Sequence, residues 1–371
     1  MTLNLESFQA KLDQEYEKLK KETKKPNVLI VGGTGVGKSS LVNLCFGKDI
    51  AEIGVGKSVT QYLSSYEDDD IPIVLFDTKG YEIGSEEELL FLNDVIAYAQ
   101  KSQHEAKKRI HIVWYCIQAS SHRILDFDIK IIAQLQNLGL PVALVFTKCD
   151  LVSEGEAEVL EKVARQALPR TPAFQTTIKL DWNKLDLENL CNWSIDNLEG
   201  GLRFAFICAQ KINLMAKERE AKNIVYQHSM ASGAVGFTPI PFSDAPILLA
   251  NQAGMIARIL FVFNLNSLTV KFQSVFSVLG PTLLSGTGIW VAGQLTKFLP
   301  IIGSITGGII SASVASSLTL AVGLAMVEVC YRIGLLCLEG DEDKIKDFFM
   351  IVENIFLEAL QRHFKPETGK I

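Results

Sequence analysis

Eight consecutive residues have the types and spacing of a loop that binds phosphate groups. They are Gly32, Gly33, Thr34, Gly35, Val36, Gly37, Lys38 and Ser39. In a glycine-rich turn before a helix, backbone N–H groups surround phosphate oxygens and the helix dipole adds positive charge. The pattern predicts that Lys38 reaches the β- and γ-phosphates of a nucleotide and that Ser39 binds Mg²⁺, with Ser40 as the next residue of the binding segment. The alternative is a glycine-rich turn that carries lysine and serine without this function.

A second motif places a carboxylate and a glycine after an apolar run. Asp77 follows residues 73–76, and Gly80 comes three residues later. In this position the carboxylate can contact Mg²⁺ through water, and the Gly80 N–H can meet the γ-phosphate. A turn after a strand can carry the same residues, so the assignment depends on the distance from the phosphate loop.

A third motif, Thr147, Lys148, Cys149 and Asp150, follows the apolar run 142–146 and would separate guanine from adenine. The Asp150 carboxylate can accept from the N1–H and the 2-amino group of guanine, while the Lys148 stem lies along the base. Adenine lacks this donor pair and would leave Asp150 unpaired. An ordinary strand end with lysine and aspartate is the alternative. The three motifs together predict a site for GTP or GDP with Mg²⁺.

The elements that must position these motifs follow a strand and helix rhythm from residue 27 to about 180. Short apolar runs at 28–31, 73–76, 110–117 and 142–146 alternate with longer amphipathic stretches, which predicts an α/β domain with a mainly parallel sheet. Residues 60–66 alternate between polar and apolar types, as an edge strand does. We expect an amphipathic leader helix over residues 1–25, a nucleotide-binding domain over 26–200 and an all-helical domain over 201–371.

Composition limits the classes of partner. The chain has 42 acidic and 36 basic residues and a net charge of -6, which argues against nucleic-acid binding. Seven scattered cysteines without a C-x-x-C pattern indicate neither a disulfide framework nor a zinc site and fit a reducing cytosol. The charged residues 1–25 do not resemble a secretory signal, so we expect a cytoplasmic protein.

The order of these motifs resembles that of the translation-factor-related GTPases, and most closely their Era and TrmE branch. The resemblance covers residues 26–180 and implies an α/β P-loop GTPase fold in which Lys38, Thr60 and Gly80 take part in catalysis. It also implies that Thr60 is the switch threonine that joins Ser39 and Asp77 around Mg²⁺, although a threonine on an edge strand is the alternative. The resemblance further implies that residues 175–178 stand in for the last guanine loop of the family, with Thr177 as a nucleotide contact.

Two departures from the family pattern concern hydrolysis. Ras-type enzymes carry a water-orienting glutamine directly after this second motif, where the chain has Tyr81. Potassium-activated relatives such as TrmE carry asparagine where the chain has Gly35. The resemblance therefore implies slow intrinsic hydrolysis, or help from an activating partner or a second copy.

The second half of the chain is apolar and rich in glycine and serine. Residues 272–296 and 298–327 contain no charged side chain, and each is long enough to span a bilayer. A buried helical bundle needs the same small residues, so both a bundle and membrane contact stay open. Residues 222–335 resemble the helical domain of YcjF-type proteins, through the segments 237–246, 298–304 and 315–319.

We therefore expect a cytoplasmic GTPase switch whose helical domain reports the nucleotide state. A membrane-anchored or membrane-remodelling GTPase of the dynamin or immunity-related kind is the leading alternative. An Era-like ribosome-assembly factor would need a basic RNA-binding domain, which this acidic chain does not suggest.

Overall fold

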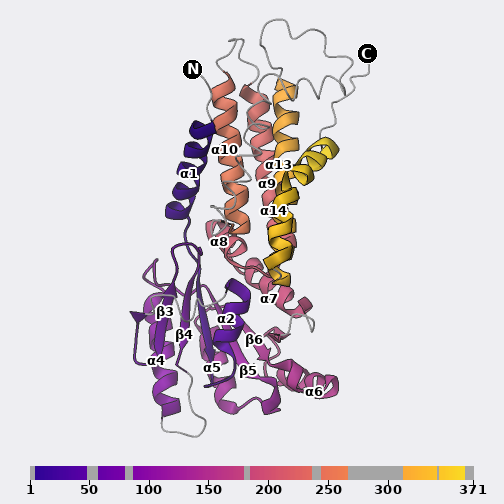
Figure 1. Cartoon of the computed structure of the whole chain (residues 1–371). Coiled ribbons are helices and arrows are strands. Elements are labelled where there is room, and N and C mark those ends of the chain that lie inside the picture. Colours follow the sequence, from indigo (N-terminus) through magenta and orange to yellow (C-terminus); the bar gives the residue numbers. More distant parts are fainter. Residues whose placement is uncertain are drawn as a thin grey trace, which may run out of the picture. The chain divides into compact units, whose positions relative to one another are not determined.

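The computed structural model describes residues 5–47, 57–79, 87–178, 184–235, 244–265, 312–340 and 342–363. The chain divides into two compact units (Figure 1). The first comprises residues 23–213, and the second combines residues 1–22 with residues 214–371.

The first unit is built on a seven-stranded sheet with the strand order β2-β3-β4-β1-β5-β6-β7. Its strands are β1 (Asn27–Gly32), β2 (Lys57–Ser58), β3 (Leu63–Glu67), β4 (Val74–Thr78), β5 (Ile112–Gln118), β6 (Val142–Thr147) and β7 (Ala173–Gln175). The four pairs from β4 to β7 are parallel, while the pairs β2–β3 and β3–β4 are antiparallel. The predicted mainly parallel α/β fold is confirmed. Thr60, however, precedes β3 instead of beginning the strand.

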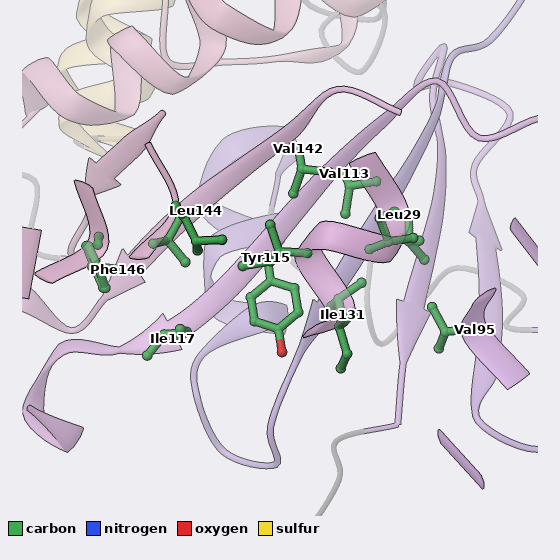
Figure 2. Close-up of a cluster of buried hydrophobic side chains, with 14 of the residues drawn as sticks. Leu29, Val95, Val113, Tyr115, Ile117, Ile131, Val142, Leu144 and Phe146 are labelled. Carbon is green, nitrogen blue, oxygen red and sulfur yellow. The ribbon is translucent and has the colours of Figure 1, made fainter. Parts of the chain in front are cut away.

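Helices cover both faces of this sheet, as its almost fully apolar central strands require. They are α2 (Lys38–Phe46), α4 (Glu87–Ser102), α5 (Asp126–Asn137), α6 (Glu154–Ala167), α7 (Lys184–Asp196) and α8 (Gly200–Ala209), with the 3-10 turns η1 (Ala119–Ser121) and η2 (Cys149–Leu151). On one face, alternate strand residues pack with apolar side chains of α4, α5 and α6. Figure 2 labels residues of this cluster: Leu29, Val95, Val113, Tyr115, Ile117, Ile131, Val142, Leu144 and Phe146.

Trp114 marks the opposite face, because it alternates with Val113 and Tyr115 along β5. Its ring stacks on Phe46 of α2 at 5.7 Å and meets Phe206 of α8 edge-on at 6.4 Å. Its indole N–H donates to Ser194 of α7 at 3.1 Å. Helix α8 therefore packs in the core of the first unit, whereas the boundary expected at residue 200 assigns it to the helical half.

The second unit is a group of long helices, and its described part contains no strand. They are α1 (Leu5–Glu22), α9 (Leu214–Val235), α10 (Asp244–Phe263), α13 (Ala312–Glu339) and α14 (Glu342–His363). The N-terminal α1 lies along α10 (Figure 1), with the rings of Tyr16 and Phe261 in edge contact at 5.6 Å. The leader helix thus belongs to the same unit as the C-terminal helices.

Helices α9 and α13 approach closely. A Cβ on Gly323 would lie 2.6 Å from a methyl carbon of Val225, so the contact depends on glycine. Ser232 pairs with Thr319 at 2.9 Å, and Ser229 with Ser316 at 3.0 Å. Small and hydroxyl side chains therefore join these two helices. The segments 272–296 and 298–304, most of 237–246 and the first part of 298–327 lie outside the described residues.

Within the described part of the chain, one helix is long and apolar enough to cross a membrane. It is Ser316–Glu339, which contains an 18-residue window with a mean hydropathy of 1.8. Of that window, 56 % is buried inside the protein, and a core helix of a helical bundle has the same length and composition.

Candidate nucleotide-binding site

The phosphate loop is the turn between β1 and α2, and two glycines set its course. Gly32 ends β1 with φ +152°, and a Cβ there would lie 2.4 Å from the carbonyl oxygen of Cys116 in β5. Gly37 precedes α2 with φ +103°, a left-handed conformation that glycine adopts without strain. Thr34, Gly35, Ser39 and Ser40 are exposed around the start of α2. The loop and the start of its helix are therefore accessible at the surface of the first unit.

Lys38 is buried under this loop, with 8 % of its surface exposed. Its Nζ donates to the carbonyl oxygens of Gly32 and Gly33, both at 3.0 Å. Burial lowers the pKa of Lys38, and the nearby Asp77 carboxylate opposes that shift. An ammonium group has three donors, so one remains for a phosphate oxygen after the two loop contacts.

Asp77 lies on β4, in register with Ile30 of β1. Burial raises the pKa of Asp77 to about 6, and the Lys38 charge opposes this shift. Its Oδ1 atom is buried and has no hydrogen-bond partner among the described residues. A buried carboxylate oxygen without a donor is suited to a cation or its bound water, so this residue fits the predicted Mg²⁺ site.

The third motif is tied directly to the phosphate loop. The Thr147 hydroxyl donates to the carbonyl oxygen of Val36. Lys148 has a left-handed backbone with φ +55°, and its Nζ donates to the carbonyl oxygen of Gly35 at 2.7 Å. The segment that would read the base is thus held against the segment that would hold the phosphates.

Asp150 and Thr177 come together although 27 positions separate them. The Thr177 hydroxyl donates to Oδ1 of Asp150 at 2.8 Å. Thr176 supports this contact from the backbone, since its carbonyl oxygen accepts from the Cys149 N–H at 3.1 Å and its N–H donates to Phe146 at 2.7 Å. The end of β7 therefore lies beside the third motif, where the last guanine loop was predicted.

Of the two residues that the resemblance assigns to the switch, Thr60 is described by the structure and Gly80 is not. The Thr60 hydroxyl donates to the Asp94 carboxylate on α4, and the same carboxylate oxygen accepts from the Tyr62 N–H at 3.2 Å. Binding of Mg²⁺ by Thr60 would require this bond to open. Gly80 and Tyr81 lie outside the described residues.

Gln118 is a residue of this site that the motifs do not reveal. Its Oε1 accepts from Lys148 at 3.0 Å, and its Nε2 donates to the Ser120 hydroxyl. It also lines a cavity of about 480 Å³ beside the phosphate loop, together with Gly33, Thr34, Arg123 and others. Neither Lys38 nor Asp150 lines that cavity, which is bounded by part of the phosphate loop and by residues at and after the end of β5. The position of Gln118 at the carboxyl end of a strand next to β1 is the signal that could have identified it.

Comparison with known proteins agrees with this geometry. The family model described as 50S ribosome-binding GTPase matches residues 27–148. A probable GTP-binding protein EngB from Aquifex aeolicus is 30% identical over 148 residues, covering 38% of this chain and 75% of that protein. A second EngB, from Mycoplasmopsis agalactiae, is 26% identical over 170 residues, covering 45% and 85%.

The GTPase Era from Caldicellulosiruptor saccharolyticus is 28% identical over 140 residues, covering 37% of this chain and 44% of Era, so the similarity spans less than half of that protein. The residues that the family model matches, 27–148, contain the phosphate loop, Asp77 and Lys148. The chain therefore belongs to the GTPase family that includes EngB and Era, and its family domain lies in the first unit.

Proposed function

We propose that the first unit binds GTP and GDP with Mg²⁺, hydrolyses GTP slowly and acts as a switch. The hydrogen bond between Thr177 and Asp150 is the observation that supports this best. It joins the two segments that would surround a guanine base, beside a lysine that donates to the phosphate loop. This arrangement suits a single ligand that carries both a base and phosphates.

Each residue has a defined role in this proposal. Lys38, held by two carbonyl oxygens, directs its remaining donor at the β- and γ-phosphates. Ser39 and Asp77 would hold Mg²⁺, which supplies charge neutralisation at the phosphate oxygens when bound. Asp150 accepts from the guanine donors while Thr177 fixes its carboxylate. Backbone N–H groups of the phosphate loop complete the contacts.

The switch would operate through Thr60 and Gly80. Thr60 is bonded to Asp94 on α4 in this structure. Closure of Thr60 over the γ-phosphate would exchange that bond for contacts with the nucleotide and Mg²⁺. Release after hydrolysis would restore it, which is how an ordered loop reports the nucleotide state.

Guanine specificity is tested by Asp150→Asn. The variant should lose affinity for GTP and gain affinity for xanthosine triphosphate, because an asparagine NH₂ pairs with the C2 oxygen of xanthine. Hydrogen-bond mismatches of this kind discriminate by up to roughly 10⁴-fold. The measurement is displacement of a fluorescent guanine nucleotide by GTP, ATP and xanthosine triphosphate. A variant that keeps the wild-type order of preference would show that Asp150 does not read the base.

Slow hydrolysis is tested by single-turnover assays in potassium and in sodium. We expect a low rate that is equal in the two salts, because Gly35 and Tyr81 replace the residues that accelerate related enzymes. A rise that is specific to potassium would mean that another residue supplies the cation site. A fast rate in both salts would contradict the proposal that a partner or second copy is needed.

The helical unit would couple to this switch. Guanine nucleotide is the ligand of the first unit, and a second copy of the chain or an activating protein is the partner of the whole protein. We propose a cytoplasmic protein, which agrees with seven free cysteines, six of them buried. The likeness of residues 222–335 to YcjF-type domains stays a prediction. The observation that supports the membrane alternative is the apolar helix Ser316–Glu339. Membrane fractionation of the full chain that resists high salt would support that alternative.

A further inference from the structure

We propose that Gln118 is a positioning residue for the nucleotide base, acting through Lys148. This inference rests on the proposed function, because Lys148 matters only if a base lies against its stem. No sequence motif of the site includes Gln118. Its role follows from a chain of hydrogen bonds that begins at Ser120 and ends at the phosphate loop.

The two ends of the Gln118 amide have different partners. Oε1 accepts from the Lys148 ammonium at 3.0 Å, and Nε2 donates to the Ser120 hydroxyl. A reversed amide would point an NH₂ group at a cation, so the Lys148 contact defines which way the amide faces. Ser120 therefore holds the amide in the orientation that Lys148 needs.

Lys148 is fixed at two points by this arrangement. Its Nζ donates to the carbonyl oxygen of Gly35 at 2.7 Å and to Oε1 of Gln118 at 3.0 Å. A lysine stem has four carbons and many rotamers when its end is not held. With the ammonium anchored, the stem is preorganised along the plane where the base would lie, and less freedom is lost when the ligand binds.

The backbone explains why residue 118 can do this. Gln118 is the last residue of β5 and pairs in register with Thr147 of β6, the residue directly before Lys148. The Gln118 side chain therefore begins next to the third motif and is close enough to contact Lys148 directly. In this parallel sheet, both positions lie at the carboxyl ends of the strands, where ligands of such folds bind.

The proposal predicts a specific pattern of affinities. GTP and GDP carry the same base, so loss of the Gln118 contact should weaken both by the same factor. We expect roughly a tenfold loss, as for one hydrogen bond to a charged group. The loss should require Lys148, because Gln118 acts only through that side chain.

The test is a double-mutant cycle on the full chain, with GTP and GDP binding measured by calorimetry. Gln118→Met keeps the length of the side chain and removes the amide. It should weaken both nucleotides in the wild-type background and have no further effect in Lys148→Ala. Gln134→Met, at an exposed position of α5 in the same unit, is the matched control and should leave both affinities unchanged.

Ser120→Ala provides a second variant that leaves Gln118 in place. It should give a smaller loss in the same direction, and that loss should also vanish in Lys148→Ala. Equal losses with and without Lys148 would overturn the positioning role, as would unchanged affinity in Gln118→Met. Failure of the wild-type protein to bind GTP would instead overturn the proposed function on which this inference rests.

Discussion

At the scale of single residues, the site holds two buried charges at a cost. Burial lowers the pKa of Lys38 and raises that of Asp77 to about 6, so each shift disfavours the charged form. Their mutual attraction opposes both shifts without cancelling them. A ligand that brings phosphate to Lys38 and a cation to Asp77 would offset the lost hydration. The two residues whose charged forms are disfavoured by burial are thus those assigned to phosphate and Mg²⁺.

Lys38→Ala should abolish tight GTP binding and leave the protein folded. The change removes a charge-assisted hydrogen bond to phosphate, worth about 1.5 to 3 kcal/mol, while the loop backbone and its glycines remain. Calorimetry with GTP and a thermal melt of the same sample measure the two effects. Lys130→Ala, at an exposed position on α5, is the control and should bind as the wild type does. Unchanged GTP affinity in folded Lys38→Ala would contradict the phosphate-loop assignment.

At the scale of elements, each motif is placed by a strand that ends at the same edge of the sheet. Parallel pairing of β4, β1, β5 and β6 brings Asp77, the phosphate loop, Gln118 and Thr147 to that edge. Aromatic side chains pack against the face of the sheet that carries Trp114. Phe206 of α8 is fully buried and meets Phe46 of α2 edge-on at 5.8 Å. Helix α8 therefore supports the helix that carries Lys38 and Ser39.

Phe206→Ala should destabilise the first unit by about 3 to 5 kcal/mol, because it removes a buried aromatic ring and leaves a cavity. Amide hydrogen exchange of β1 and β5 should become faster, as measured by mass spectrometry. Arg203→Ala changes a half-exposed side chain of the same helix, with a long 3.8 Å ion pair to Asp196, and should have little effect. Equal exchange in the two variants would mean that α8 is not part of this core.

At the scale of the whole molecule, the chain builds its second unit from both of its ends. Helix α1 packs on α10, although more than half of the chain separates them. The two units are therefore linked twice in sequence, before residue 23 and after residue 213.

Tyr16→Ala should destabilise the helical unit by about 3 kcal/mol, because the ring is buried against Phe261. Hydrogen exchange should become faster in α10 and stay unchanged in β1 and β5. Lys18→Ala, an exposed position on α1, should leave exchange in α10 unchanged. If α10 exchanges as fast in the Lys18 variant as in the Tyr16 variant, the Tyr16 ring does not stabilise this unit.

The sequence by itself determined the α/β class, the four central strands and the three motifs. These features are local, because a glycine-rich turn, an apolar run and a strand-ending carboxylate are each encoded by neighbouring residues. It also predicted a helical second half. The roles assigned to Thr60, Gly80 and Thr177 stay predictions, and they depend on nucleotide binding.

Only the tertiary structure decided which distant segments meet. It placed Gln118 against Lys148, gave Thr60 a partner in Asp94, packed Phe206 behind Trp114 and set α1 beside α10. The same local sequence is compatible with several such pairings. Polarity and periodicity show which face of an element is buried, but they do not show which other element covers it. That choice depends on strand order, register and the fit of side chains across the whole chain, which no single segment contains.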